Sequence, residues 1–551
     1  MKKNKKILII IVLFIITYSL FEIIINKYKD EQLFEAKWNA PDTTLAITIN
    51  GEISTTFPTS SAYETSVECT TGTGKVEWNG SKWVLTTSGI TKGSTKCNAT
   101  FNQTLKQSIL ANNEVKAPLT TPGREVSAYT LDDVTTTSTA IVASTYQKYY
   151  VTYGTGWEAN GAKLNLTGTA VTSDTYANSY SSLVGKYLVS NSYYYFGSST
   201  VGATATTTNL SCVYYVVSAT SSSFTYKPLC SNKNKLEAEL ASTEDDYGTS
   251  YYFRGAVKNN YVQFANKCWR IVRINGDGSV KLVLHNDNTS SSSNPCAASN
   301  NSTTAAFAKY SGSTYNTAFN SSYNYNAYIG FMYGTTSSSD YASTHANINK
   351  STILTNLETW YKDNLTSYES KLADTIWCND KSTFTTLSSG RKYGTGLGYG
   401  TSHTGYGAYN RLDGDGAASY ANPSLICPND NNGGKLSKFT VSDTINGNGN
   451  LTYKIGLLTA DEIAFAGYAY GAQNTTVYFQ ENATGSWWWA LSPEHFGGGF
   501  ATVWGVNGGD GYFGGASVNN SFRVRPSISL VSSTTISGGS GTSEDPYVVK
   551  S

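Results

Sequence analysis

The sequence predicts a multidomain, β-rich protein with an N-terminal transmembrane helix, one or two all-β, sandwich-like domains and a C-terminal α+β domain. Three observations support this prediction. At 551 residues the chain is too long for one compact domain. Charged residues make up only 14%, against roughly 25% in an average soluble protein, and Ser, Thr, Asn, Gly and Tyr replace them. Short runs of alternating apolar and polar residues recur between Asn-Gly turns, which is typical of strands in hairpins.

The charge balance narrows the range of functions. The formal net charge is +1, so the basic excess of nucleic-acid-binding domains is missing and no nucleic-acid partner is expected. Aromatic residues make up 13% of the chain, which argues against a disordered polymer. β-rich domains whose outer faces are solvated by hydroxyls and amides fit this composition.

The N-terminus carries the first predicted element. Residues 1–6, MKKNKK, form a basic cytoplasmic tail, and residues 7–26 form an apolar segment whose length is close to the ~20 residues that span a bilayer. Because basic residues favour the inside of a membrane, we expect a single-pass signal anchor in the cell membrane, with the C-terminal portion extracellular. A cleaved signal peptide is the alternative, although no small-x-small cleavage site follows.

The cysteines predict an oxidising compartment. They occur in well-separated twos without a C-x-x-C pair, which argues against zinc ribbons and thioredoxin-like motifs. We expect disulfides between sequence neighbours, with buried free thiols as the alternative. The candidate disulfide cysteines are Cys69, Cys97, Cys212, Cys230, Cys268, Cys296, Cys378 and Cys427.

Two β regions follow the anchor. Residues 40–116 are predicted to form a small β domain, in which LAITING and KVEWNGSKWVLTTSGI alternate like strands and Cys69 pairs with Cys97. An immunoglobulin-like sandwich is compatible with this pattern, and the domain is either a spacer or a binding module. Residues 117–235 form a second β region, whose tyrosines either present a carbohydrate-stacking face or pair across strands.

Residues 240–551 are predicted to form one C-terminal domain with long insertions. Near its start, strands 268–274 and 280–284 form a hairpin, in which Arg270 and Arg273 are expected to leave the buried side. The Asp-Gly turn between the strands resembles a calcium loop. It lacks the twelve-residue ligand spacing, so turn chemistry explains it better.

A long insertion and a helix are predicted to follow this hairpin. Residues 286–345 are rich in Ser and Asn and are expected to form a long surface loop or an extended excursion. Residues 350–373 carry apolar residues at three- and four-residue steps, which predicts a helix. Ser351 or Thr352 can cap its start.

A glycine-rich loop and a short helix complete the middle of this domain. Residues 375–450 are expected to form the loop, held near its ends by a disulfide between Cys378 and Cys427. Thr459 and Glu462 then have the spacing of a capping box, which predicts a helix start.

The most distinctive stretch, residues 454–530, carries a resemblance to a known group of proteins. The runs LLTADEIAFAG, WWWALSP and FRVRPSISL, followed by GGSGTSEDPYVV, resemble those of uncharacterised bacterial surface proteins. The block YFRGAVKNNYVQFANKCWRIVRINGDGS resembles the opening strands of the same group, so the resemblance covers residues 240–550. It implies a C-type-lectin-like C-terminal domain, the fold shared with formylglycine-generating enzymes, which would present long loops as a binding surface.

The resemblance implies that the ligand-facing positions lie between the tryptophan-rich strand and the closing RVRP strand, at about residues 494–520. Aromatic, amide and carboxylate side chains alternate there with glycines, a composition that suits sugar stacking or peptide docking. Alternatively the aromatic residues fill the core, as we expect of Trp487, Trp488 and Trp489. The candidate ligand-binding residues are Glu494, His495, Phe496, Phe500, Trp504, Asn507, Asp510, Tyr512, Phe513 and Asn519.

These patterns favour a binding protein over an enzyme. No cysteine follows Cys427, whereas formylglycine-generating activity needs a cysteine pair in this domain. The histidines lack metal-ligand spacing, so no catalytic residue, metal or cofactor is predicted. Glu494 and His495 could hold a water, but adjacent strand residues face opposite ways. We expect an adhesin or receptor that binds an extracellular glycan or protein; a self-associating envelope protein is the alternative, and a glycan hydrolase is less favoured.

Overall fold

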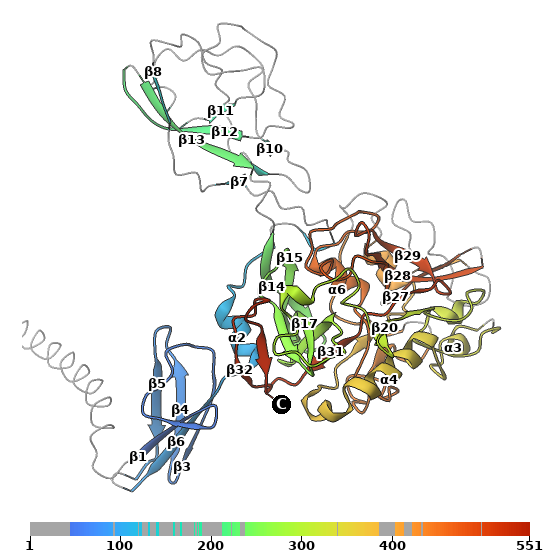
Figure 1. The fold of residues 1–551 in the computed structure, drawn as a ribbon, viewed down its shortest axis with the longest axis horizontal. Helices are drawn as coiled ribbons and strands as arrows, with labels where there is room; N and C mark the ends of the chain where they lie inside the picture. Colours follow the sequence, from blue (N-terminus) through green and yellow to red (C-terminus); the bar gives the residue numbers. More distant parts are fainter. Residues whose placement is uncertain are drawn as a thin grey trace, which may run out of the picture. The chain divides into compact units, whose positions relative to one another are not determined.

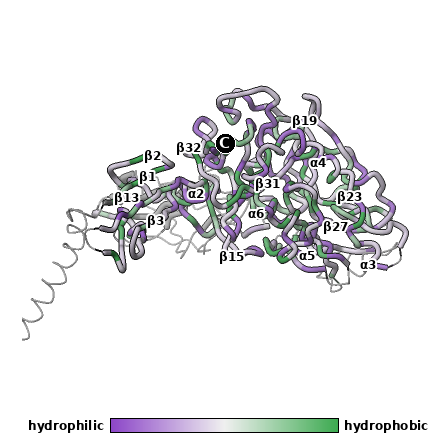
Figure 2. Tube along the Cα trace, turned by 90° about the horizontal axis from the view of Figure 1, so that it is seen from below, coloured by the Kyte–Doolittle hydropathy of each residue, from purple (hydrophilic) through white to green (hydrophobic). Residues whose placement is uncertain are grey.

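The chain divides into two compact units, Met1–Ala111 and Asn112–Ser551, in the computed structural model (Figure 1). The residues it describes are 44–118 without 92 and 93, short segments between 119 and 236, and 237–550 without 339, 385–402, 413–420, 431–433 and 498. The predicted cytoplasmic tail and membrane anchor, residues 1–6 and 7–26, lie outside this part of the chain. Within it, no helix combines the length and the apolar character needed to cross a bilayer, and the trace alternates between hydrophobic and hydrophilic stretches (Figure 2).

The N-terminal unit is a small β domain with the hairpins that the sequence predicts. Its strands are β1 (Thr44–Ile49), β2 (Glu52–Ser54), β3 (Glu64–Cys69), β4 (Thr73–Trp78), β5 (Trp83–Ser88) and β6 (Lys96–Asn102). Four of them form a sheet in the order β2-β1-β6-β3, and β4 pairs with β5 as a separate hairpin. Asn50 and Gly51 connect β1 to β2 with φ angles of 52° and 91°, the left-handed conformation that favours Asn-Gly in such turns.

The sheet and the separate hairpin of this unit share one core. The rings of Trp83 and Phe101 lie 5.3 Å apart, and Trp78 packs on Trp83 at 5.4 Å. The predicted disulfide between Cys69 and Cys97 is present and joins the neighbouring strands β3 and β6. The sheet and the hairpin therefore bury common side chains. Helix α2 (Leu105–Asn112) follows β6.

The second β region is described in short segments, chiefly strands. Its five-stranded antiparallel sheet consists of β7 (Leu131–Asp132), β8 (Thr139–Val142), β11 (Tyr187–Val189), β12 (Cys212–Ala219) and β13 (Ser223–Ser231), and β9 (Glu158–Ala159) pairs with β10 (Leu166–Thr167). Cys212 lies opposite Cys230 in the register of β12 and β13, so the backbone brings this predicted pair together. The tyrosine side chains of the region lie outside the described residues.

An eight-stranded sheet begins the C-terminal part of the chain. Its strands are β14 (Ala238–Asp245), β15 (Gly248–Gly255), β16 (Tyr261–Phe264), β17 (Lys267–Ile274), β18 (Val280–Asn286), β31 (Ser527–Leu530), β32 (Ile536–Gly538) and β33 (Tyr547–Val549). β17 and β18 form the predicted hairpin. β31 pairs with β18 and β33 with β16, so strands between residues 261 and 286 lie beside strands between residues 527 and 549 (Figure 1).

The arginines of β17 do not leave the buried side of the sheet, contrary to the sequence prediction. All eight residues of this strand are buried. Arg270 Nη1 lies 2.8 Å from Glu481 Oε2, and Arg273 forms ion pairs with Asp245 and Glu462. Buried cations are tolerated here because carboxylates replace the lost water.

A second sheet carries the tryptophan-rich hairpin. Its strands are β21 (Asn316–Thr317), β25 (Thr404–Gly405), β27 (Trp487–Gly497), β28 (Phe500–Asn507), β29 (Phe513–Ser517) and β30 (Phe522–Arg523). The pairing of β27 with β28 shifts register between Trp489 and Pro493 and again between Pro493 and His495. Trp488 and Trp489 are buried as expected, whereas Trp487 is half-buried.

The predicted helix at 350–373 is present but shorter. α4 spans Thr352–Asn364, and the chain continues as the 3-10 helix η5 (Thr366–Lys371). The Ser351 hydroxyl caps α4 by accepting from the Leu354 N–H at 3.2 Å, which confirms one of the two expected caps.

The predicted capping box starts α6 (Ala460–Ala466). Thr459 Oγ1 accepts from the Glu462 N–H, and Glu462 Oε2 accepts from the Thr459 N–H, both at 3.0 Å. The remaining elements are η3 (Ala298–Asn300), β19 (Lys309–Tyr310), β20 (Ser313–Thr314), η4 (Asn326–Ile329), β22 (Met332–Tyr333), α3 (Tyr341–Thr344), β23 (Asn349–Lys350), β24 (Trp377–Cys378), α5 (Gly407–Leu412) and β26 (Lys438–Phe439). The described chain is therefore β-rich, with several sheets and few, short helices.

Residues 286–345 do not form the expected surface loop. Their fully buried side chains include Phe307, Phe319, Ile329 and Phe331. The predicted disulfide between Cys268 and Cys296 is present and links the start of this segment to β17. The predicted disulfide between Cys378 and Cys427, which lies outside this segment, is also present. A few aromatic residues among many Ser and Asn thus suffice to place the segment in the core.

Candidate functional site

The end of the β27–β28 hairpin carries an exposed aromatic residue in a stacked pair. Phe500, the first residue of β28, is 49% exposed. Its ring lies nearly parallel to that of Tyr323, with centroids 4.9 Å apart and an interplanar angle of 6°. The Ala501 N–H donates to the Tyr323 carbonyl at 2.8 Å, so backbone contacts hold the two rings together.

Three segments of the chain meet at this end of the second sheet. The Val518 N–H donates to the Ala501 carbonyl at 3.0 Å, and the Asn320 N–H donates to the Val518 carbonyl at 3.0 Å. These bonds place the connection between β29 and β30 beside the segment that leads into η4. Exposed Asn519 therefore lies at the same end of the sheet as Phe500.

Further tyrosines follow Tyr323 in the same segment. The ring centroids of Tyr325 and Tyr328 lie 6.3 Å apart, and those of Tyr328 and Tyr333 lie 5.4 Å apart. All are half-buried. Burial raises the pKa of Tyr333, with a further contribution from Tyr328, so its hydroxyl stays protonated and can donate at neutral pH. We call Tyr323, Tyr325, Tyr328, Tyr333 and Phe500 the aromatic tip.

The aromatic tip is built from uncharged segments. Asp, Glu, Lys and Arg are missing from residues 318–338, 496–507 and 513–522. The amide oxygens of Asn324 and Asn519 accept from Ser322 and Ser517 at 2.7 and 2.8 Å, which orients both exposed amides. Flat rings bordered by oriented amides can stack on the apolar face of a sugar and hydrogen-bond its hydroxyls.

The sequence-predicted ligand residues do not gather at one surface. Phe500 and Asn519 lie at the end that carries the aromatic tip. Asn507, Asp510 and Tyr512 lie at the other end of β28, where the Asn507 N–H donates to the Tyr512 carbonyl at 2.8 Å. Because the whole of β28 separates these two groups, they cannot form one patch.

Four predicted residues lie in the core rather than at a surface. They are Glu494, Phe496, Trp504 and Phe513. The rings of Trp504 and Phe513 lie 4.7 Å apart, and η4, α5 and α6 contact the hairpin strands β27 and β28. For these aromatic residues the alternative interpretation, that they fill the core, is correct.

Glu494 and His495 do not face opposite ways, contrary to the sequence argument. The register shift between Pro493 and His495 breaks the alternation. Glu494 Oε2 consequently lies 3.1 Å from His495 Nδ1. The carboxylate also covers Gly515, because a Cβ added there would lie 1.4 Å from Glu494 Oε2.

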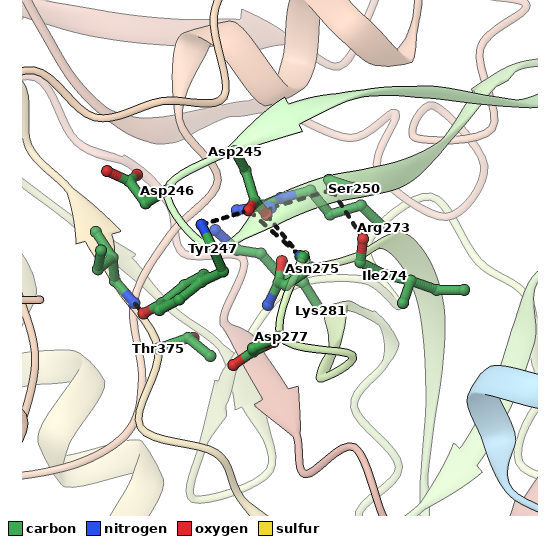
Figure 3. A network of polar contacts seen from close by, with 12 residues as sticks. Asp245, Asp246, Tyr247, Ser250, Arg273, Ile274, Asn275, Asp277, Lys281 and Thr375 are labelled. Atoms are coloured by element: carbon green, nitrogen blue, oxygen red, sulfur yellow. Dashed lines mark hydrogen bonds and ion pairs between the residues drawn. The ribbon is translucent and has the colours of Figure 1, made fainter. Parts of the chain in front are cut away.

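The sequence reasoning missed a charged pocket between the first sheet and α6. Asp245 accepts from the Tyr247 N–H at 2.8 Å and forms an ion pair with Arg273 (Figure 3). Glu462 lies 3.0 Å from Arg273 Nε and 2.6 Å from Lys281 Nζ. The Arg residues of the CWRIVRI run were the sequence signal, but their partners lie far along the chain.

Burial and ion pairing shift the pKa values of Lys281 and Glu462 in this pocket. Burial lowers the pKa of Lys281 to about 8, although Glu462 opposes the change. Burial alone would raise the pKa of Glu462, but the adjacent cations outweigh it and lower the pKa. Arg411 pairs with Asp380 and Asp461, each at 2.8 Å. These ion pairs connect β14, β17 and β18 of the first sheet with α6, and α6 with α5.

Comparison of the chain with protein-family models, with curated proteins and with solved structures produced no match. Within the described ranges, no three His, Cys, Asp or Glu side chains are arranged to hold a metal ion. The aromatic tip is therefore the surface whose chemistry points most directly to a ligand. The sequence analysis did not name the tyrosines of the tip as candidate ligand residues. The run YNYNAY contains three of them, but it lies in the segment that was expected to form a surface loop.

Proposed function

We propose that this chain is a membrane-anchored surface adhesin or receptor that binds a neutral glycan at the aromatic tip. The observation that carries the proposal is the stack of Phe500 on Tyr323, which leaves a large apolar ring half-exposed on a fixed support. A ring that is already held in place loses little conformational entropy when a ligand stacks on it.

The chemistry of the tip favours a carbohydrate over a charged peptide. The segments that build it contain no acidic or basic residue, so a charged ligand would lose hydration without gaining a partner. A sugar offers both an apolar face for the rings and hydroxyls for the amides of Asn324 and Asn519.

We infer a C-type-lectin-like, α+β domain for residues 240–551, supported by the long β27–β28 hairpin, the closing strand β31 and the irregular segments that meet at the tip. The disulfides Cys268–Cys296 and Cys378–Cys427 support an extracellular location. Residues 7–26 would anchor the chain in the membrane.

We propose that the chain binds the glycan without hydrolysing it. The Glu494 carboxylate, the acid that a hydrolase at this segment would need, is buried, and its Oε2 lies 3.1 Å from His495 Nδ1. In that position the carboxylate lies against Gly515 of β29.

A glycan array probed with the full-length chain in detergent tests the proposal. We expect binding to one class of neutral glycan and loss of that signal in the Tyr323→Ala and Phe500→Ala variants. Tyr512→Ala is the matched control, because Tyr512 is also half-buried but lies at the other end of β28. Binding that Tyr512→Ala and Phe500→Ala weaken equally, or no binding to any neutral glycan, would contradict the proposal.

A further inference from the structure

The buried lysine Lys381 faces a side-chain amide. Its Nζ lies 2.5 Å from Asn347 Oδ1, and both residues are buried. The Asn347 Nδ2 donates to the Leu436 carbonyl at 3.0 Å, which fixes the amide with its oxygen toward the lysine. A nitrogen nucleophile is thus held next to a carbonyl carbon in a site that excludes water.

This arrangement differs from that of the other buried lysines in the described part of the chain. Lys267 pairs with Asp287, and Lys281 pairs with Glu462, so each of these two lysines contacts a carboxylate. Lys381 donates instead to a neutral amide, and the Phe439 ring lies 6.0 Å from its Nζ.

The Asp430 carboxylate is close enough to Lys381 for their charges to interact. Its Oδ1 accepts from the Ser437 hydroxyl at 2.8 Å, whereas its buried Oδ2 has no hydrogen-bond partner among the described residues. Burial raises the pKa of Asp430 to about 6 against the attraction of Lys381. Burial also lowers the pKa of Lys381 to about 8, and Asp430 opposes that change. Both shifts bring the pKa values of the lysine and the aspartate closer together, which lowers the cost of moving a proton from one to the other.

We propose that Lys381 and Asn347 become joined by an intramolecular isopeptide bond, with Asp430 as the proton carrier. The Lys381 ammonium gives a proton to Asp430, and the neutral Nζ attacks Cγ of Asn347. A C–N bond forms between Nζ and Cγ, the bond between Cγ and Nδ2 breaks, and Nδ2 leaves as ammonia after taking up a proton from Asp430. Ammonia and the second Nζ proton leave together as ammonium, so no oxidant or co-reactant is needed.

The bond would reinforce the base of the segment that carries the tip tyrosines. Asn347 lies between β22 and β23, which pair with each other, and Tyr333 of the aromatic tip belongs to β22. Lys381 follows Cys378, which is bonded to Cys427. A second covalent link would therefore hold this segment where one disulfide already closes the neighbouring loop, whether or not the tip binds a glycan.

Mass spectrometry of the reduced, full-length chain tests this bond. We expect the wild-type mass to fall below the sequence mass by one ammonia, about 17 Da. After tryptic digestion, the peptide that ends at Lys350 should remain joined to the peptide that spans Lys381. The Lys381→Met and Asn347→Ser variants should show the full sequence mass, and Asp430→Asn should accumulate unlinked chain.

The wild-type measurement decides the proposal even if a variant fails to fold. Separate peptides at the sequence mass would overturn it, as would an unlinked peptide heavier by about 1 Da, which indicates hydrolysis of Asn347. Lys281→Met is the control, because it removes another buried lysine and should keep the loss of ammonia. Complete linkage in Asp430→Asn would show that Asp430 does not carry the proton.

Discussion

The ring of Phe500 lies 4.9 Å from that of Tyr323 and almost parallel to it. The two residues come from segments far apart in the sequence, and a backbone hydrogen bond from Ala501 joins those segments. Because the support is fixed before binding, little conformational entropy is lost when a ligand stacks on the exposed face.

Removing the charge of Glu462 should destabilise the C-terminal unit strongly. Glu462→Gln leaves Arg273 and Lys281 without their shared carboxylate in a buried site, which typically costs about 3–5 kcal/mol. Urea unfolding measures the change. Glu244→Gln, on the exposed end of β14, should change the free energy of unfolding by less than about 0.5 kcal/mol. Similar values for the two variants would contradict the account of the charged pocket.

The contribution of Lys281 to the free energy of unfolding should increase as the pH rises above neutrality. The pKa of Lys281 is about 8 in the folded protein, against 10.5 for a lysine without such contacts, as in the unfolded chain. Between pH 8 and pH 10.5 the unfolded chain therefore still binds a proton that the folded chain has released. The free energy of unfolding contributed by this group therefore increases with pH across that window. Unfolding measured from pH 7 to 10 should give a smaller slope for Lys281→Met than for the wild type, and equal slopes would contradict the prediction.

The disulfide between Cys268 and Cys296 should contribute measurable stability. It closes a loop with a sequence separation of 28, for which constraint of the unfolded chain predicts roughly 2–4 kcal/mol. A Cys268→Ala, Cys296→Ala double variant should lose about this much free energy of unfolding. Unchanged thermal and urea unfolding would show that the bridge is dispensable.

Local features of the fold could be predicted because neighbouring residues decide them. The turn at Asn50 and Gly51, the capping box of Thr459 and Glu462, and the pairing of Cys69 with Cys97 all depend on short stretches of sequence. In each case one backbone conformation or one short loop closure determines the outcome.

The buried charges and the aromatic tip could not be predicted in the same way. Arg273 is buried because Glu462, which follows 189 residues later, neutralises it. Tyr323 became part of the candidate site only because tertiary contacts bring it to Phe500. At Glu494 the side chain does not follow the alternation expected of a strand, because the register of β27 shifts between Pro493 and His495.

Binding at the aromatic tip should depend little on ionic strength. The three segments that form the tip carry no charged residue, so no ion pair is available for salt to screen. The Kd for a glycan found on the array should change by less than about threefold between roughly 0.05 and 0.5 M NaCl. A Kd that rises steeply with salt would indicate a charged ligand and a different surface.

The most direct test of the central claim is the Kd of that glycan for Phe500 variants of the full-length chain. Phe500→Tyr keeps the ring and should bind within about threefold of the wild type, whereas Phe500→Ala should weaken binding by at least about tenfold. If Phe500→Ala bound the glycan as tightly as the wild type does, the aromatic tip would not be the binding surface.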